Sequence, residues 1–343
     1  MNFAYKFPAV RGIQAGKEYY ISMVPLKLLS KLFPAEVDTV LPEYRAQRRI
    51  NEARIPEIRD YILENRNNYV FSALSASIDG DFSFIEHKGT NLGILEIDMN
   101  AIFLINDGQH RKTAIEAALV EDEELGNETI SIVFFTDKGL ARSQQMFTDL
   151  NKHAVKTSNS LATLYDERDQ VAVATKRVID SVLFFKKFTD KERDILGKNS
   201  SNLFTLNMIY KANQRIIRGN NSCSEEDIEF LIKYWKIVSE NILEWQEVLA
   251  KELTKKSLRE NYIVTLAITI NALGKLGRYF YIHKNCDMLT YLIRLRHIDW
   301  SRSNKIWIGT TIRENGKVLN SEEAVSLTCS VIKKYIGLPI NNE

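Results

Sequence analysis

The chain has 343 residues, of which 45% are hydrophobic and 26% are charged, and its formal net charge is +2. These proportions are typical of a soluble globular protein with one large domain or two smaller ones. No apolar run reaches the length of a membrane-spanning helix, the first residues lack the apolar core of a signal peptide, and three widely spaced cysteines suggest no disulfide framework, so we expect a cytoplasmic protein.

The small net charge hides an uneven distribution. Residues 251 to 334 contain 15 Lys and Arg against 7 Asp and Glu, whereas residues 1 to 250 contain 31 basic and 36 acidic residues. A basic C-terminal part could meet a polyanion such as DNA. Solvated faces of ordinary helices would give the same counts, so charge alone leaves both interpretations open.

The N-terminal third alternates short strands with one Arg-rich helical region. Residues 5–24 predict one or two strands that turn between Gly12 and Gly16, followed by a short helix from Pro25 to Phe33. The region Tyr44–Asn65 predicts helix, with a fresh start at Pro56. Period-two patterns predict further strands over Tyr69–Ile78, Phe82–His87 and Leu92–Ile97.

The stretch Ala101–Leu119 combines three signals. Ile102–Ile105 is a short apolar run typical of a buried strand, the turn-formers Asn106, Asp107 and Gly108 follow, and helical spacing begins at His110. A helix that opens on a glycine turn presents its first amides to an anion. Gln109, His110 and Arg111 add donors, and an arginine can hold a phosphate through two parallel hydrogen bonds. The pattern predicts a phosphate-binding turn, and an ordinary Asp-Gly turn is the alternative.

Thr129–Phe135 predicts a buried strand, and Gly139–Leu164 predicts a helix that ends near Asn151. We place a domain boundary loosely between residues 165 and 200, because this region is rich in charge and ends in a polar Gly-Lys-Asn-Ser-Ser-Asn tract. The rest predicts helices, among them single helices over Glu225–Leu253 and Arg259–Tyr281, and a last helix capped by Asn320.

Two groups of basic residues in this helical part are candidates for DNA contact. Lys211, Arg215 and Arg218 fall on one stripe of a predicted helix. Arg294 and Arg296 form a second group, which Trp300 and Trp307 follow. Cations beside aromatic rings suit nucleic acid, although tryptophans at this spacing also serve as core anchors.

The five residues Asp107 to Arg111 match the DGQHR signature of the DndB family, which is linked to DNA phosphorothioate modification. The stretch more distantly resembles the G-x-x-R motif of the ParB/sulfiredoxin fold, where a glycine helix start and an arginine hold nucleotide phosphates. The later segment Phe147–Ser158 is similar to the DndB family in its FxxLN and K-x-S character. ParB-like proteins carry an ENxxR motif there, and only Asn151 matches it.

The resemblance implies an α/β (α+β) fold: a ParB/sulfiredoxin-like domain over residues 1–165, then an all-helical domain over residues 166–343. It implies a cytoplasmic repressor of a DNA phosphorothioation gene cluster, with an operator upstream of a modification operon as its DNA partner. ATP, with or without Mg²⁺, would tune the grip on DNA. Other DNA-modification proteins and a second copy of the chain are further expected partners. The expected nucleotide-binding residues are Gly108, Gln109, His110, Arg111 and Asn151.

The expected DNA-binding residues divide between the two domains. Arg48 and Arg49 would face nucleotide or DNA, since ParB-like proteins place an arginine just before the corresponding helix; surface salt bridges are the alternative. The others are the basic residues of the helical part: Lys211, Arg215, Arg218, Arg294 and Arg296.

An enzyme is the alternative function. Asp107 and His110 could activate water beside a phosphate, as in a slow ATPase, another nucleotide hydrolase or a ParB-like nuclease. The chain has no P-loop and no histidine pair at metal-binding spacing, so we predict no metal site. A third possibility is a scaffold in which DGQHR is purely structural.

Overall fold

The computed structural model describes residues 3–34, 51–136, 145–146, 157–198, 200–218 and 223–339. It divides into two compact units, Met1–Val155 and Lys156–Glu343. The first contains a seven-stranded sheet and the second is mostly helical, which confirms a mixed α/β class. The ParB/sulfiredoxin-like arrangement stays a prediction. No helix in the described part of the chain is both long and apolar enough to span a membrane.

The two units meet in sequence earlier than the predicted division at 165/166. Helix α5 (Asn159–Tyr165) belongs with the second unit, because it packs on helices of that unit and its start is held there. The carboxylate of Asp194 accepts hydrogen bonds from the backbone N–H groups of Asn159 and Ser160, each at 2.8 Å. The charge-rich segment in which we placed the domain boundary therefore helps to cap α5.

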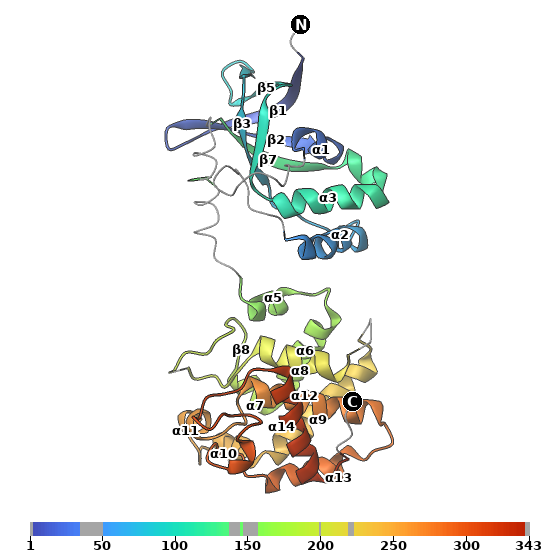
Figure 1. Cartoon of the computed structure of the whole chain (residues 1–343), viewed down its shortest axis with the longest axis vertical. Coiled ribbons are helices and arrows are strands. Elements are labelled where there is room, and N and C mark those ends of the chain that lie inside the picture. The colour runs from blue at the N-terminus through green and yellow to red at the C-terminus, as the bar shows by residue number, and fades with distance from the viewer. Residues whose placement is uncertain are drawn as a thin grey trace. The chain divides into compact units, whose positions relative to one another are not determined.

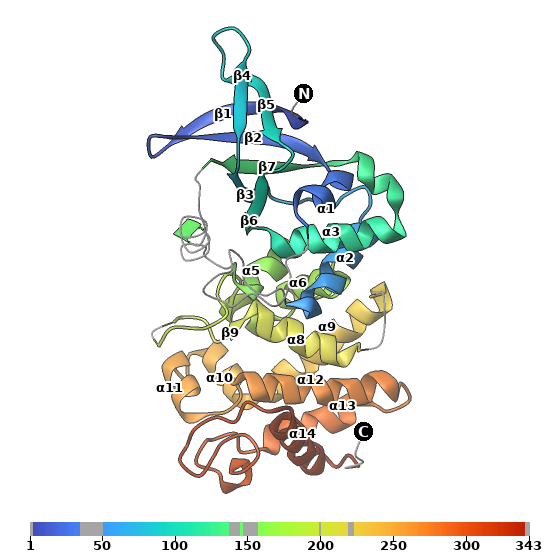
Figure 2. The same ribbon diagram turned by 45° about the horizontal axis from the view of Figure 1, so that its top comes forward.

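The sheet of the first unit has the strand order β4-β5-β1-β2-β7-β3-β6 (Figures 1 and 2). Its neighbours are antiparallel except for β3 and β7, which are parallel. The N-terminal pair turns at Ala15–Gly16 as predicted, whereas the strand predicted over Tyr69–Ile78 begins only at Leu74. The strands are β1 (Ala4–Gln14), β2 (Lys17–Pro25), β3 (Leu74–Asp79), β4 (Phe82–Glu86), β5 (Leu92–Asp98), β6 (Ile102–Asp107) and β7 (Thr129–Phe135).

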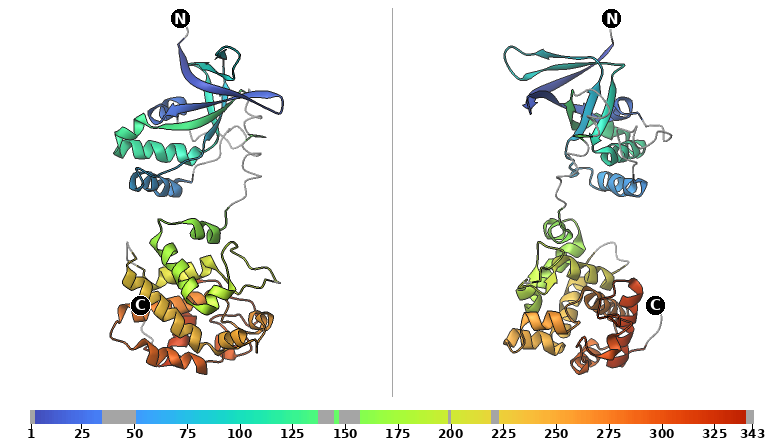
Figure 3. Two further views of the ribbon diagram at one scale, coloured as in Figure 1. Left: turned by 180° about the vertical axis from the view of Figure 1, so that it is seen from behind. Right: turned by 60° about the vertical axis from the view of Figure 1, so that its left-hand side comes forward.

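Helices cover one face of this sheet. Alternate residues of β7 are buried, and Ile132 and Phe134 join Ile115 and Ala118 of helix α3 in one core. Helix α2 lies beside α3, as Figures 1 and 3 show. The helices of this unit are η1 (Leu26–Leu28), α1 (Leu29–Leu32), η3 (Glu52–Arg54), α2 (Ile55–Glu64), α3 (Gln109–Glu121) and η4 (Glu123–Asn127).

The second unit folds around aromatic side chains. Trp235 and Trp245 are fully buried, and Phe184 stacks on Trp245 with ring centroids 4.8 Å apart. Two short parallel strands, β8 (Thr189–Asp190) and β9 (Phe204–Thr205), interrupt the predicted all-helical pattern. The helices are α5, α6 (Gln170–Ser181), α7 (Leu183–Phe188), α8 (Leu206–Ile216), α9 (Glu225–Asn241), α10 (Leu243–Ala250), α11 (Lys255–Asn261), α12 (Ala267–Ile282), α13 (Met288–Leu292), η5 (Ile293–His297), η6 (Lys305–Trp307) and α14 (Glu322–Ile336).

Both long helices predicted in this unit are broken. Between α9 and α10, Ile242 is extended, and the Asn241 side chain donates to the carbonyl of Ile237 at 2.8 Å, which competes with the helical pattern. Between α11 and α12, the backbone pairs instead with the segment around Trp300, through an Ile263 N–H bond to Trp300 O of 3.0 Å. Helical periodicity in a sequence does not reveal such a break, because the apolar spacing continues across it.

The start of the last helix is also one residue later than predicted. Ser321, rather than Asn320, caps α14, and its Oγ accepts from the Ala324 N–H at 3.1 Å. The predicted stop at Gly337 is confirmed, where the backbone has a φ of +82°.

Candidate phosphate-binding turn

The predicted strand, turn and helix around DGQHR are all present. Strand β6 runs through Asp107, Gly108 makes the turn, and α3 begins at Gln109. The strand is longer than predicted, because it continues through Asn106 to Asp107, which pairs with Ser75 of β3. The turn therefore consists of a single residue.

Only glycine fits this turn. Gly108 has a φ of +98°, a region that side-chain-bearing residues rarely adopt. A Cβ placed there would lie 2.4 Å from Cδ2 of Leu74, which is fully buried. Backbone conformation and close packing thus both require a glycine.

Helix α3 begins without a side-chain cap. Gly108 is the N-cap residue, and its carbonyl accepts from the Lys112 N–H at 2.9 Å. The earlier amides of an α-helix have no partner within the helix, and its dipole favours a negative charge at this end. No acidic side chain lies in the first turn of α3, so the charge at this end is suited to an anion.

Arg111 is held by the protein itself. Its Nη1 donates to the carbonyls of Ser72, at 2.7 Å, and Ala73, at 3.0 Å, and also to the Ser72 hydroxyl. Its Nη2 donates to Oδ2 of Asp107 at 2.7 Å. We predicted that Arg111 grips a phosphate, but these contacts make it a clamp between the start of α3 and the segment before β3.

His110 and Asp107 also have internal partners. Nε2 of His110 accepts a hydrogen bond of 3.0 Å from the Asn51 N–H, so that nitrogen carries no proton in this arrangement. Asp107 binds Arg111 through Oδ2 and is about half exposed. The side chain of Gln109 is partly exposed at the first position of the helix.

A β-bulge lies directly before the motif. Ser75 pairs with Asp107, but Ala76 pairs with Ile105, so Asn106 is the extra residue. Asn106 is 1% exposed and donates from Nδ2 to Ser77 Oγ at 2.9 Å. Its Oδ1 and the Oγ of Ser75 are buried without a hydrogen-bond partner among the described residues.

Unpaired buried polar atoms are costly, and bulges often lie next to binding sites. From the sequence we expected Asn106 only to form the turn. The sequence signal for the bulge at Asn106 was a polar residue at the end of an otherwise apolar strand.

Charged groups fix the other end of α3. Nε of Arg66 donates to Oδ2 of Asp122 at 2.6 Å, and Arg66 and Tyr69 both bind Glu128. The hydrogen bond from Arg66 lowers the pKa of Asp122 below its ordinary value. Burial, together with the bond to Glu128, raises the pKa of Tyr69. This network attaches the segment after α2 to the end of α3, so the helix is held at both ends.

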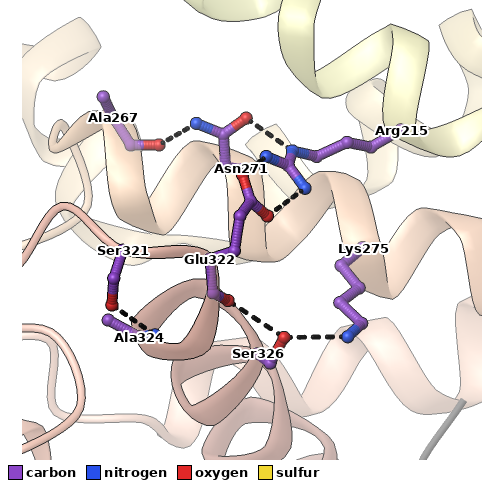
Figure 4. Close-up of polar contacts among 8 residues, drawn as sticks. All are labelled: Arg215, Ala267, Asn271, Lys275, Ser321, Glu322, Ala324 and Ser326. Carbon is purple, nitrogen blue, oxygen red and sulfur yellow. Dashed lines mark hydrogen bonds and ion pairs between the residues drawn. The ribbon is translucent and has the colours of Figure 1, made fainter.

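The predicted basic stripe on α8 has two different parts. Lys211 is exposed on the helix, and Arg218 is exposed just beyond its end. Arg215 instead connects three helices, as Figure 4 shows: its Nε donates to Asn271 of α12 at 3.0 Å, and its guanidinium binds Glu322 of α14 through both carboxylate oxygens.

The second basic group is also engaged in the fold. Arg294 donates to the carbonyl of Ile336 at 2.9 Å, and Arg296 donates to Oδ1 of Asn241 at 2.7 Å. Trp300 and Trp307 are buried and stack with centroids 5.4 Å apart, so they are core anchors and cannot stack on a base. Of the five basic residues predicted here for DNA, Arg215 is half-buried and the other four are exposed. Lys211 and Arg218 are the exposed candidates on and just beyond α8, whereas Arg294 and Arg296 each also bind the fold.

Three predicted site residues, Arg48, Arg49 and Asn151, lie outside the described residues. Within the described ranges, no group of three or more His, Cys, Asp or Glu side chains is arranged to hold a metal ion.

Comparison with known proteins identifies a family. A family model described as DndB, DNA-sulfur modification-associated, matches residues 7–339. No curated protein and no solved structure matches the chain. The matched range covers both units and includes the DGQHR turn. The chain therefore belongs to the DndB family, whose members are associated with DNA-sulfur modification.

Proposed function

We propose that this protein is a DNA-binding repressor of a DNA phosphorothioate-modification gene cluster, and that ATP bound at the DGQHR turn modulates its grip on DNA. Membership of the DndB family supports the link to DNA-sulfur modification. The observation that carries the nucleotide part is the glycine-initiated start of α3, an uncapped end of a 13-residue helix with no acidic side chain in its first turn.

The contacts at the turn support different roles for its residues. The amides at the start of α3 would bind a phosphate, and the Gln109 side chain would add a donor. Arg111 would act mainly by positioning the turn, because its guanidinium is hydrogen-bonded to Ser72, Ala73 and Asp107. The unpaired buried oxygens of Ser75 and Asn106 are consistent with a binding site, since such groups need a compensating role.

DNA would meet the basic second unit. Lys211 and Arg218 are exposed, and residues 251–334 carry an excess of positive charge. Phosphate contacts of this kind supply affinity without sequence information. Recognition of a specific base sequence would require a further element of the protein that contacts the bases.

The alternative, a hydrolase or nuclease, would need Asp107 or His110 to act on water. Oδ2 of Asp107 is bound by Arg111, and Nε2 of His110 is bound by the Asn51 N–H. Binding is therefore the role that these contacts support better than catalysis.

The substitution Gln109→Glu tests the nucleotide site. A carboxylate at the first position of α3 interacts favourably with the helix dipole, so the fold should keep its stability, whereas it repels phosphate at close range. We expect ATP binding, measured by calorimetry on the full chain, to weaken at least tenfold.

The matched control is Asn91→Asp, which converts an exposed amide just before β5, away from the turn, to an acid. It should leave the ATP affinity within twofold of the unchanged protein. Equal affinities for both variants, or no ATP binding by the unchanged protein, would exclude the turn as the nucleotide site.

A further inference from the structure

A pocket of about 620 Å³ lies in the second unit, and the charged residues that line it are mostly basic. Lys198, Lys255, Lys256 and Arg259 contribute positive charge, against the single carboxylate of Glu260. Three hydroxyl side chains, those of Ser200, Ser201 and Thr254, complete the polar lining. We refer to these eight residues as the basic pocket.

The fold explains how the cations come to one wall. Leu258 is fully buried and anchors α11 to the core. Lys255 and Arg259 are four residues apart on this helix, and so are Lys256 and Glu260, so the two pairs form adjacent rows. Thr254 caps the helix by accepting from the Ser257 N–H at 3.1 Å, which fixes where the rows begin.

Arg259 also holds the segment that carries Lys198. Its Nη1 donates to the carbonyl of Gly197 at 2.9 Å and to that of Lys198 at 3.3 Å. These bonds attach the segment before β9 to α11. Lys198 is exposed on that segment, so it brings a third ammonium group to the same concave surface.

The three lysine side chains of the basic pocket are held by their neighbours to different degrees. The Lys255 ammonium lies 5.5 Å from the centre of the Phe188 ring, a cation–π contact that orients it. Lys198 and Lys256 are exposed and can turn toward a ligand. The guanidinium of Arg259 already donates hydrogen bonds to backbone carbonyls. The lysines, which act as compact point charges, would therefore make the direct contacts with an anion.

A concave surface with cations of one sign raises the local concentration of anions, and hydroxyls beside ammonium groups suit the oxygens of a phosphate. The volume is in the range of small-ligand sites, which is enough for a phosphate with part of what carries it. We propose that the basic pocket binds phosphate, supplied either by the DNA backbone or by a free nucleotide. The DNA source rests on the proposed function, whereas phosphate binding itself does not.

The test compares two doubly substituted full-length chains. Lys255→Glu with Lys256→Glu reverses two charges in the basic pocket. Lys233→Glu with Lys236→Glu reverses two exposed lysines of α9, which do not line it, and so changes the net charge equally. The probes are a 20-base-pair duplex of random sequence and inorganic pyrophosphate, each titrated over a salt series after thermal melts have verified folding.

The pocket variant should bind its phosphate source at least tenfold more weakly at low salt, while the α9 variant stays within threefold. If the source is DNA, the loss is seen with the duplex, and the slope of log affinity against log salt becomes shallower by about 1 to 2. If the source is a free nucleotide, the loss is seen with pyrophosphate.

Equal behaviour of the two variants on both probes would overturn the proposal. If the pocket variant does not fold, Lys255→Gln with Lys256→Gln removes the charges without adding repulsion, and the same comparison decides. Failure of the repressor proposal would look different: the unchanged protein would not distinguish upstream DNA from random DNA, although binding of random duplex could still depend on the basic pocket.

Discussion

At the scale of single residues, Gly108 determines the shape of the DGQHR turn. Gly108→Ala combines a φ of +98° with a Cβ placed 2.4 Å from Leu74. We expect urea denaturation to show a loss of about 2–4 kcal/mol, since each effect costs about 1–3 kcal/mol. Gly89→Ala is the matched control, because it has a φ of +72° with nothing within 4 Å. Equal losses in the two variants would mean that packing against Leu74 contributes nothing.

The bulge residues allow a second comparison. Ser75→Ala removes a buried hydroxyl that has no partner among the described residues, so stability should be unchanged or rise by up to about 1 kcal/mol. Ser77→Ala removes the acceptor of the Asn106 amide and should cost about 1–3 kcal/mol. Thermal or urea unfolding of both variants shows whether Ser77→Ala loses more stability than Ser75→Ala. If Ser75→Ala is the more damaging of the two, its hydroxyl has a structural partner after all.

Glu244 in the second unit predicts a pH dependence. Burial, followed by the charges of Glu247 and Asp299, raises its pKa from 4.5 to about 7. The folded state therefore binds this proton more tightly, and the stability associated with it declines as pH rises from about 4.5 to 7. Glu244→Gln should be more stable than the unchanged protein by about 1–3 kcal/mol at pH 8 and nearly equal at pH 4.5. Urea unfolding at both pH values measures this gain in stability, and the exposed Glu252→Gln is the control. A gain in Glu244→Gln that is the same at both pH values would contradict the prediction.

At the scale of elements, the contact between α8 and α12 depends on two glycines. A Cβ at Gly274 would lie 2.8 Å from the carbonyl oxygen of Ala212, which is backbone and cannot rotate away. A Cβ at Gly277 would meet only side-chain atoms, those of Ile216 and Tyr234 at 2.9 Å, and buried side chains shift at a lower cost than the backbone of a helix. Gly274→Ala should therefore cost about 1–3 kcal/mol more than Gly277→Ala in urea unfolding. The reverse order would show that the helices can separate at Gly274.

The same elements show what the sequence could predict. Strand β7 and the strand-turn-helix of DGQHR were predicted because apolar periodicity and glycine placement are local signals. The break after Asn261 was missed because it depends on a distant partner, the backbone near Trp300. The break at Ile242 was missed because the apolar spacing continues across it. The site shows the same limit: spacing placed Arg111 at the turn but could not reveal that the carbonyls of Ser72 and Ala73 occupy it.

At the scale of the whole molecule, structural cations should be separable from DNA-contacting cations. Arg215→Ala breaks the contacts to Asn271 and Glu322, so we expect a loss of about 1 kcal/mol in stability and little change in DNA affinity at the same folded fraction. Lys211→Ala and Arg218→Ala should each weaken DNA binding several-fold without changing the melting temperature. Fluorescence anisotropy with labelled duplex, together with thermal melts, checks this. The assignment fails if Arg215→Ala shows the larger loss of affinity.

The central claim concerns the whole chain: a DNA-binding regulator with a nucleotide-responsive turn. The most direct measurement is binding of the full-length protein to a DNA fragment from upstream of its own gene, against random DNA of equal length, over a salt series with and without ATP. We predict at least tenfold tighter binding to the upstream fragment, a change of several-fold on adding ATP, and loss of that ATP response in Gln109→Glu. Equal, salt-sensitive binding to both fragments, unaffected by ATP, would contradict the account.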